Sequence, residues 1–527
     1  MIKGYWIPVL HSHLPFVKHP KFNYFLEEHW LFEAMTECYI PLLRKLKKLE
    51  KENVDFRLTI SVTPPLAQML DDKHLMQKYE EHLNNQLLLA YKESKRNQND
   101  EVYRDVSNFY NNLYKDTKDF FINELDRNVL NGYKYFSDLG KLEVITCGAT
   151  HGFLPLLSVN KKAVEVQIQL AVESHQKHFG KSPKGIWIPE CAYYEGLDEI
   201  LSKYGIEFFF VDSHSLVYAK PTALNGVYAP IYAPSGVAAF GRDPHSSKEV
   251  WSSKEGYPGD VNYRDFYRDI GYDLEFDYIK DHIDPSGNRC FTGFKYHKIT
   301  GNSDYKEVYN PYTALEKTIA HAQDFHYKRD KQFEYLSANI DRIPVVVSHY
   351  DAELFGHWWF EGVEFLYNLF KTIDQHKAFK AITPKEYLIN YPQNQMAVPQ
   401  ASSWGDQGYY DVWLNEGNSW IYRHLHTMAN RLQNLANEYK SGTSLENTRL
   451  LNQMLRELLL AQSSDWAFLI TTQTAVEYSV QRTKEHISNF FELEKMINSD
   501  IDYQLLEELE YKNSIFDFCN YKIFCSN

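Results

Sequence analysis

The sequence predicts an α/β fold in which a parallel barrel of seven strands precedes a helical domain. Short apolar runs alternate with segments of helical spacing, and nearly every run ends in His, Asp, Glu or Arg. A parallel barrel carries its chemistry at the carboxyl ends of its strands. A doubly wound open sheet, the structural alternative, would gather such residues at one switch point instead. The runs span residues 5–10, 57–62, 142–147, 186–188, 208–211, 236–240 and 344–347.

The stretch GIWIPECAYY at 185–194 shows the pattern most clearly. Pro189 cannot donate a hydrogen bond to a sheet, so the apolar run should end there. Glu190 follows directly, where a barrel would place a functional carboxylate. Alone, this residue could equally cap a helix beginning near Tyr194. The same arrangement at the other strand ends favours the functional interpretation.

The helical segments divide the chain into two predicted domains. We expect residues 1–395 to form the barrel, with a helical insertion near 70–140. The region 242–340 lacks a clean strand, which predicts active-site loops and small helices. Residues 396–527 should form the helical C-terminal domain. Helical spacing is found at 30–49, 164–179 and 197–204 in the first domain and at 415–439, 450–462, 475–496 and 502–516 in the second.

Composition restricts the class of ligand. The net charge of −14 over 527 residues argues against nucleic acid or anionic membranes as partners and suits a neutral substrate. Aromatic residues make up 15% of the chain, and their flat rings can stack on the apolar faces of sugars. The six cysteines lack CxxC spacing, no apolar stretch reaches the ~18 residues of a membrane span, and the N-terminus has no cleavage site. A cytoplasmic protein without a cofactor is expected.

Glu190 and Asp351 are the candidate catalytic pair, because both follow runs that should be buried. Two carboxylates across a barrel mouth can cleave a glycosidic bond, one attacking the sugar and the other protonating the leaving oxygen. Two capping or salt-bridged acids remain the simpler alternative.

Histidines also gather at the predicted strand ends. Imidazole can act as an acid or base, hydrogen-bond sugar hydroxyls or bind a metal. A metal-dependent carbohydrate deacetylase on an irregular barrel is therefore an alternative function. The histidines are His11, His13, His151, His214 and His349.

Tryptophans form a third set of candidates. Trp404 lies in a stretch rich in Ser, Gly and Asp, which favours a ligand platform over core packing. The turn at 256–260 could bring backbone close to a ligand. A glucan-binding protein without catalysis would need only such platforms. The other tryptophans of this set are Trp251, Trp358, Trp359 and Trp413.

Five ordered motifs resemble glycoside hydrolase family 57, and most closely its 1,4-α-glucan branching enzymes. The motifs are His11-Ser12-His13-Leu14-Pro15, Gly148-Ala149-Thr150-His151, the WIPEC stretch ending at Cys191, SHYDAELFGHWW from Ser348, and SSWGD from Ser402. The loop from Arg242 through GYPGD at 256–260, and QSSDW at 462–466, resemble the branching subgroup.

The resemblance implies an irregular (β/α)7 barrel with a helical C-terminal domain folded over the cleft. It implies Glu190 as nucleophile and Asp351 as general acid/base, without a metal. The implied activity is α-1,4-glucan branching in glycogen or α-glucan biosynthesis; α-amylase and 4-α-glucanotransferase are the alternatives within the family. Implied substrate contacts are Arg242, Gly259, Trp404, Asp465, His11, His13, His151 and Trp251, with Trp30 and Trp413 as weaker candidates.

Overall fold

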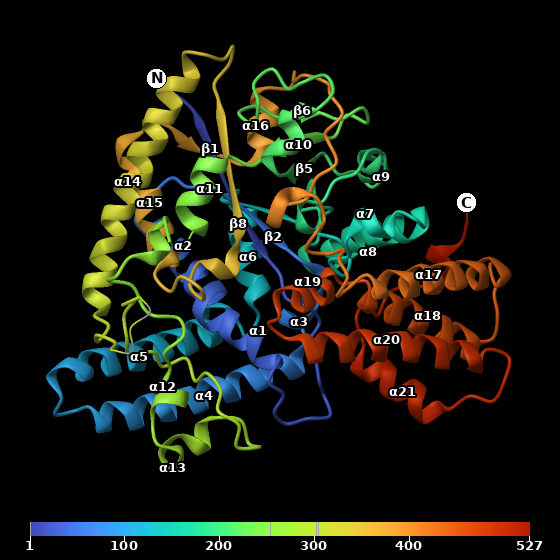
Figure 1. Cartoon of the computed structure of the whole chain (residues 1–527), viewed down its shortest axis with the longest axis horizontal. Coiled ribbons are helices and arrows are strands. Elements are labelled where there is room, and N and C mark those ends of the chain that lie inside the picture. The colour runs from blue at the N-terminus through green and yellow to red at the C-terminus, as the bar shows by residue number, and fades with distance from the viewer. Residues whose placement is uncertain (1, 253, 302, 304, 527) are drawn as a thin grey trace.

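A ring of seven parallel strands forms the centre of the molecule (Figure 1). The computed structural model describes residues 2–252, 254–301, 303 and 305–526. One sheet has the order β3-β2-β1-β8 and the other the order β4-β5-β7-β6. The ring strands are β1 (Tyr5–Ser12), β2 (Leu58–Val62), β3 (Leu142–Ile145), β4 (Gly185–Ile186), β5 (Phe208–Val211), β7 (Ala238–Gly241) and β8 (Val345–Asp351).

Few backbone hydrogen bonds join the two sheets at either seam, and the amide of Thr146 donates one of them to the carbonyl of Gly185 over 3.3 Å, between β3 and β4. The amide of Trp187 donates to the carbonyl of Thr146 over 2.9 Å, between β3 and β4. The amide of Asp243 donates to the carbonyl of Val347, also over 2.9 Å, between β7 and β8. These thin seams make the barrel irregular, and the predicted (β/α)7 class is confirmed.

Two strands were not predicted from the sequence. Strand β6 (Ile231–Tyr232) runs antiparallel to β7, and β9 (Lys380–Ala381) pairs with the start of β1. Each has two residues, too few for a pattern of alternation. The predicted strand at 186–188 is also wrong in extent, because β4 ends at Ile186 and a 3-10 turn, η3 (Pro189–Cys191), follows closely.

Helices connect the strands and cover the outside of the ring. Helices α1 (Glu28–Ala34) and α2 (Ile40–Lys51) are joined by a π-helical turn, η1 (Met35–Tyr39). The long pair α4 (Lys73–Arg96) and α5 (Glu101–Asp119), with η2 (Phe120–Glu124) and α6 (Val129–Asp138), occupies the predicted insertion. The remaining helices of this part are α3 (Pro64–Leu70), α7 (Leu154–Leu157), α8 (Lys161–Phe179), α9 (Leu197–Lys203), α10 (Ser213–Val217), η6 (Ala352–Leu354), α15 (Gly362–His376), α16 (Pro384–Asn390) and η7 (Asp406–Gly408).

The region 242–340 is more regular than predicted, because it contains the 27-residue helix α14 (Pro311–Ser337). Asn310 caps this helix and Pro311 begins it, which are ordinary start signals. Its buried face includes Thr318, His326 and Arg329, so polar residues conceal the apolar spacing. Short elements precede it: α11 (Pro244–Trp251), η4 (Tyr257–Gly259), α12 (Ile270–Asp273), α13 (Phe276–Ile279) and η5 (Lys280–His282).

The C-terminal helices lie beside the carboxyl end of the barrel (Figure 1). Thr150 donates a hydrogen bond of 2.5 Å to the carbonyl of Leu459, and Gln167 donates one of 2.9 Å to the side chain of Gln462. The sequence missed α19, and the boundary at 395/396 stays a prediction. The elements are α17 (Trp420–Glu438), α18 (Leu445–Ala461), α19 (Ser464–Thr472), α20 (Val476–Met496), α21 (Tyr503–Lys512) and η8 (Tyr521–Phe524). Within the described residues, none of the helices has the length and apolarity to cross a membrane.

Candidate active site

A cavity of about 710 Å³ opens at the carboxyl ends of the strands and receives residues from both parts of the chain. It brings together most of the predicted site. Trp30 and Gly259 are not among its lining residues: Trp30 packs edge-on against Tyr478, and Gly259 ends a turn whose Tyr257 binds Asp324 of α14. The predicted residues in the lining are His11, His13, His151, Glu190, Arg242, Trp251, Asp351, Trp404, Trp413 and Asp465.

Glu190 lies in a strained turn at the base of this cavity. Its backbone has φ 60° and ψ 22°, a left-handed conformation that non-glycine residues adopt rarely and mostly at functional sites. The indole nitrogen of Trp404 donates to Oε2 over 2.7 Å, and the Ser464 hydroxyl donates to Oε1 over 2.8 Å. The carboxylate is therefore held in one orientation from two distant segments.

Burial raises the pKa of Glu190 to about 7. The hydrogen bonds from Trp404 and Ser464 act in the opposite direction, because they stabilise the carboxylate. The nearby negative charge of Asp465 adds to the rise. The group can thus be ionised near neutral pH only because these donors compensate part of the cost of burial.

Asp351 ends β8 and lies beside His11 in the register of the sheet. Burial raises its pKa well above the usual range, and the charges of Glu353 and Glu190 raise it further. No hydrogen bond to its carboxyl is found among the described residues. Of the two acids, Glu190 is therefore the one whose charged form is stabilised by hydrogen-bond donors.

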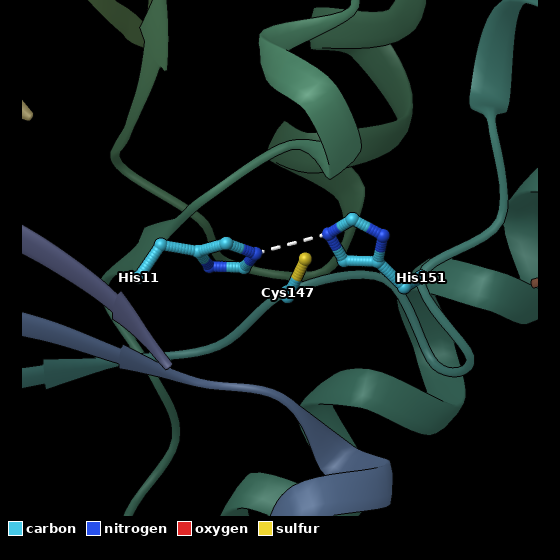
Figure 2. Close-up of side chains that lie close together, drawn as sticks. All are labelled: His11, Cys147 and His151. Atoms are coloured by element: carbon cyan, nitrogen blue, oxygen red, sulfur yellow. Dashed lines mark hydrogen bonds between the residues drawn. The ribbon is translucent and has the colours of Figure 1, made fainter. Parts of the chain in front are cut away.

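Three histidines stack along one wall of the cavity. The Nε2 atoms of His11 and His151 lie 3.0 Å apart, and Figure 2 shows Cys147 beside the two rings. The ring of His13 stacks on His151 at 3.8 Å, and its Nε2 lies 2.9 Å from Asp465 Oδ2. Burial lowers the pKa of His11 and His151, whereas for His13 the negative charges of Asp465, Glu190 and Glu353 together outweigh burial and raise the pKa. The wall offers two neutral imidazoles and one that is easily charged.

Two groups of side chains here have the spacing of metal ligands. One is His11, Cys147 and His151, and the other is His13, His151 and Asp465. Burial raises the pKa of the Cys147 thiol, which disfavours the thiolate that a metal would need. Asp465 already binds His13, and Ser464 lies 2.8 Å from His151 Nδ1. Internal hydrogen bonds therefore compete with any metal at these positions.

The remaining histidines of the predicted set are not in the cavity lining. His349 is buried beneath it, with Nε2 3.7 Å from Cys191 Sγ. His214 Nε2 donates to the carbonyl of Gly408 over 2.9 Å. Trp359 is likewise buried, so the expectation of a binding role for all these rings is too broad.

Another part of the lining is built from Arg242 and two indoles. The Arg242 guanidinium lies 5.5 Å from the centre of the Trp404 ring, and its Nε donates to Ser247 over 2.9 Å. Trp251 lies at the end of α11 and meets Trp404 edge-on at 6.1 Å. This part of the lining combines a cation with flat apolar surfaces, which can contact both the hydroxyls and the ring faces of a sugar.

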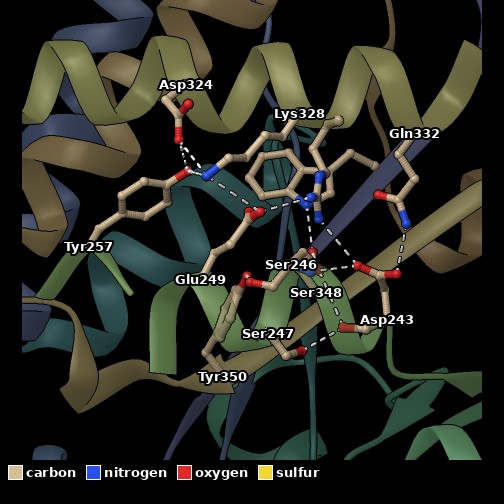
Figure 3. Close-up of polar contacts among 12 residues, drawn as sticks. Asp243, Ser246, Ser247, Glu249, Tyr257, Asp324, Lys328, Gln332, Ser348 and Tyr350 are labelled. Atoms are coloured by element: carbon tan, nitrogen blue, oxygen red, sulfur yellow. Dashed lines mark hydrogen bonds and ion pairs between the residues drawn. The ribbon is translucent and has the colours of Figure 1, made fainter. Parts of the chain in front are cut away.

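A buried ionic network fixes α11 to α14 (Figure 3). Arg329 of α14 reaches Asp243 Oδ2 at 3.3 Å and Glu249 Oε1 at 3.2 Å, so one guanidinium holds both ends of α11. Gln332 donates to Asp243 Oδ1 over 2.9 Å. The helix that carries Ser247 and Trp251 is thereby positioned on the barrel.

Several lining residues were not predicted from the sequence. Glu353 accepts a hydrogen bond from the amide of His13 over 3.2 Å and another from the hydroxyl of Tyr39. It stands two residues after Asp351, and that spacing was the available signal. Ser464 adjoins the predicted Asp465 but sits on a helix that the sequence did not reveal. The unpredicted lining residues are Leu14, Asp212, Pro244, Ser247, Lys248, Glu353, Gly405, Val412 and Phe468, together with Trp358, which had been noted only as a platform candidate.

Comparison with known proteins settles the family. The model of glycosyl hydrolase family 57 matches residues 7–400 of the 527, which is more than half of the chain. The chain belongs to glycosyl hydrolase family 57. A second model, the C-terminal region of 1,4-alpha-glucan branching enzymes, matches residues 424–524 and so covers the helices that supply Ser464 and Asp465.

Individual relatives carry two different activities in their names. The 1,4-alpha-glucan branching enzyme TK1436 of Thermococcus kodakarensis is 32% identical over 98% of this chain and 78% of its own length. The crystal structure of the alpha-amylase AmyC from Thermotoga maritima is 45% identical, with a TM-score of 0.94 and 99% coverage of both chains. The branching enzyme structure from Pyrococcus horikoshii is 32% identical, with a TM-score of 0.87, 100% coverage of this chain and 97% of that one.

Proposed function

We propose that this protein is a 1,4-α-glucan branching enzyme that acts by retaining double displacement. The observation that carries the proposal is the pair of carboxyls that line one cavity, Glu190 with two hydrogen-bond donors and Asp351 with none among the described residues. That asymmetry suits an ionised nucleophile and a protonated acid. The branching-enzyme model matched by the C-terminal region supports the choice of reaction.

In the first step, Glu190 attacks the anomeric carbon of an α-1,4-linked glucose. Asp351 gives its proton to the glycosidic oxygen of the departing chain, which leaves with a free 4-hydroxyl. The second step reverses these roles: Asp351 takes the proton of a glucan 6-hydroxyl, whose oxygen displaces Glu190 from the sugar. The product is an α-1,6 branch, and both acids return to their initial state.

The lining supplies the other requirements of transfer. The stacked rings of His11, His13 and His151 line the cavity with Glu190, and Arg242 adds a guanidinium that can donate to sugar hydroxyls. Branching also requires the sugar hydroxyl to outcompete water. Aromatic side chains limit water at the covalent intermediate; those in the lining are Trp251, Trp358, Trp404, Trp413 and Phe468.

The α-amylase activity is the second candidate, and the relative from Thermotoga maritima is the observation that favours it. Both reactions share the first step and differ in the acceptor. We therefore propose amylose digestion followed by linkage analysis as the test. A branching enzyme forms about one α-1,6 linkage per bond cleaved, with few new reducing ends. A rise of reducing ends in step with cleavage would make the protein an amylase.

Two other functions can be distinguished from a branching enzyme by simple measurements. A metal-dependent deacetylase would lose activity in a chelator and keep some in Glu190→Gln. A glucan-binding protein without catalysis would be unaffected by that substitution. The proposed substrate is amylose or glycogen, and the proposed setting is cytoplasmic α-glucan biosynthesis, which the absence of disulfides among the described cysteines supports.

A further inference from the structure

A line of aromatic rings leads out of the cavity across its surrounding loops. Trp358, which lines the cavity and is 55% exposed, stacks on Phe266 at 4.4 Å. Phe266 and Phe291 meet edge-on with their ring centres 6.0 Å apart, and Phe291 and Tyr272 meet edge-on with their ring centres 5.4 Å apart. We call Trp358, Phe266, Phe291 and Tyr272 the aromatic ridge. Tyr272 is 49% exposed and Tyr267, next to Phe266, 74% exposed, so solvent reaches the ridge along its length.

Buried charges hold the base of the ridge in place. The Lys295 ammonium lies 4.4 Å from the centre of the Phe266 ring and 4.0 Å from that of Phe291. Beside Trp358, His357 Nδ1 lies 2.7 Å from Glu37, which also pairs with Arg264 at 2.8 Å. A platform fixed in this way loses little conformational entropy when a ligand stacks on it.

Gly356 adds to this rigidity. Its φ is 112°, and a Cβ there would lie 1.9 Å from the carbonyl oxygen of Glu37. Only glycine permits so close an approach to η1. The loop after β8 is thus pressed onto the π-helical turn, and Trp358 is presented at the edge of the cavity.

A second hollow adjoins the ridge at Phe291. It measures about 210 Å³, and Phe291 belongs to its lining together with Tyr24. Its polar lining mixes amides with both signs of charge: Asn23, Asn85, Gln86, Glu81, Asp281 and Lys78. Lys78 is paired with Glu28 at 2.7 Å, and burial lowers the pKa of the lining histidines His29, His82 and His282. Among the described lining residues, the hollow therefore offers no free cation for an anionic ligand. Aromatic faces beside amide groups suit a neutral polyhydroxylated ligand.

We propose that the aromatic ridge and this hollow bind a length of α-glucan outside the catalytic cavity. The proposal rests on the proposed function, because it takes the substrate to be a glucan. The continuity of the ridge with the cavity through Trp358 identifies the occupant as a chain that is also engaged at the active site. The ridge therefore sets the preference for long chains and leaves the chemical steps unchanged.

The test compares long and short substrates in the full-length protein. Tyr267→Ala/Tyr272→Ala removes two exposed rings outside the cavity, and Tyr335→Ala removes an exposed ring from the far end of α14 as a matched control. Loss of aromatic contacts should raise KM for long amylose about three- to tenfold. KM for maltoheptaose should equal that of the parent, and kcat should be unchanged for both substrates. Retardation in amylose-containing native gels gives a readout independent of catalysis.

The outcomes separate this proposal from the proposed function. If the double variant keeps the parent's gel retardation and KM for amylose, the proposed glucan-binding role of the ridge is wrong, even if branching is demonstrated. An equal loss on both substrates would overturn it too, because that marks a disturbed active site. If the parent makes no branches but the double variant alone loses amylose retardation, the ridge stands and the branching proposal fails. A parent dimer that the double variant dissociates, with retardation intact, would assign the ridge to a second copy and overturn the proposal.

Discussion

At the scale of single residues, the two acids differ in what surrounds their oxygens. Glu190 receives hydrogen bonds from Trp404 and Ser464, whereas burial and the charges of Glu353 and Glu190 act on Asp351. Each donor stabilises the charged form of Glu190. The division of roles between nucleophile and acid therefore depends on side chains that perform no chemistry themselves.

Trp404→Phe tests this dependence directly. Removing the indole N–H leaves the carboxylate less stable, so the pKa of Glu190 rises further. The acidic limb of the kcat/KM profile should move upward by about one pH unit, since a hydrogen bond to a charged group contributes about 1.5–3 kcal/mol. Trp413→Phe is the control, because its indole nitrogen has no partner among the described residues. If the acidic limb moves equally in Trp404→Phe and Trp413→Phe, the hydrogen bond from Trp404 does not set the pKa of Glu190.

The residue-level prediction from sequence was good where a motif is contiguous. Glu190, Asp351 and Trp404 stand in short stretches with a chemical signature, and all three line one cavity. Ser464 stands in the QSSDW motif and Asp212 directly follows the run at 208–211, but neither was assigned to the site, because the hydrogen bond of Ser464 to Glu190 and the ion pair of Asp212 with Arg242 form only after folding. Gly259 was assigned to the substrate, but it is not among the lining residues of the cavity.

At the scale of elements, short helices at the barrel mouth depend on neighbours for their position. Helix α11 has eight residues and is too short to be stable alone. Arg329 fixes it through Asp243 and Glu249. The π-helical turn η1 has a similar part, because it supplies Glu37 to His357 and Tyr39 to Glu353.

Arg329→Met should destabilise the protein and weaken substrate binding. Asp243 is fully buried and would keep its charge without its cationic partner, a loss of about 3–5 kcal/mol. Ser247 and Trp251 would lose their fixed position, so KM for glucan should rise more than kcat falls. Lys331→Met, an exposed position on the same helix, is the matched control for thermal melting and kinetics. Parental melting and KM in Arg329→Met would contradict this account of α11.

Element prediction failed where tertiary contacts override local pattern. Helix α14 was expected as loops because Arg329, Thr318 and His326 interrupt its apolar face, yet each is buried in the folded protein. Strand β4 is shorter than its apolar run, since one backbone bond to Thr146 is all that continues it. These bonds form between distant segments and leave no trace in local sequence.

At the scale of the whole molecule, the site is shared between the barrel and the C-terminal helices. Asp465 and Ser464 come from α19, and they contact His13, His151 and Glu190. Glu190 is thereby held between the barrel and α19. Burial raises the pKa of both acids of the candidate pair, which links the stability of the whole protein to pH.

Asp351→Asn should make the protein more heat-stable above neutral pH. The folded pKa of Asp351 lies above its unfolded value, so the parent is fully stable below the unfolded pKa and loses stability as pH rises through the folded pKa. The amide carries no charge and escapes this loss. We expect a melting temperature about 2–4 °C higher than the parent at pH 8, and a difference that vanishes near pH 4.

Asp341→Asn is the control for this prediction. Asp341 is exposed, and the hydrogen bond from Arg342 lowers its pKa, so its amide should bring no gain at alkaline pH. An equal gain in both variants would point to general charge reduction in a chain of net charge −14. If Asp351→Asn melts at the same temperature as the parent at pH 8, the raised pKa of Asp351 is contradicted.

The central claim is that Glu190 becomes covalently bonded to the sugar while Asp351 handles the proton. Asp351→Asn treated with a maltosyl fluoride, whose fluoride leaves without a proton donor, should accumulate the glycosyl-enzyme because the second step lacks its base. Mass spectrometry of the acid-quenched, digested protein measures this directly. We predict one maltosyl unit on the peptide that contains Glu190. An unmodified Glu190 peptide alongside fluoride release, or a sugar attached to another carboxylate, would contradict the account.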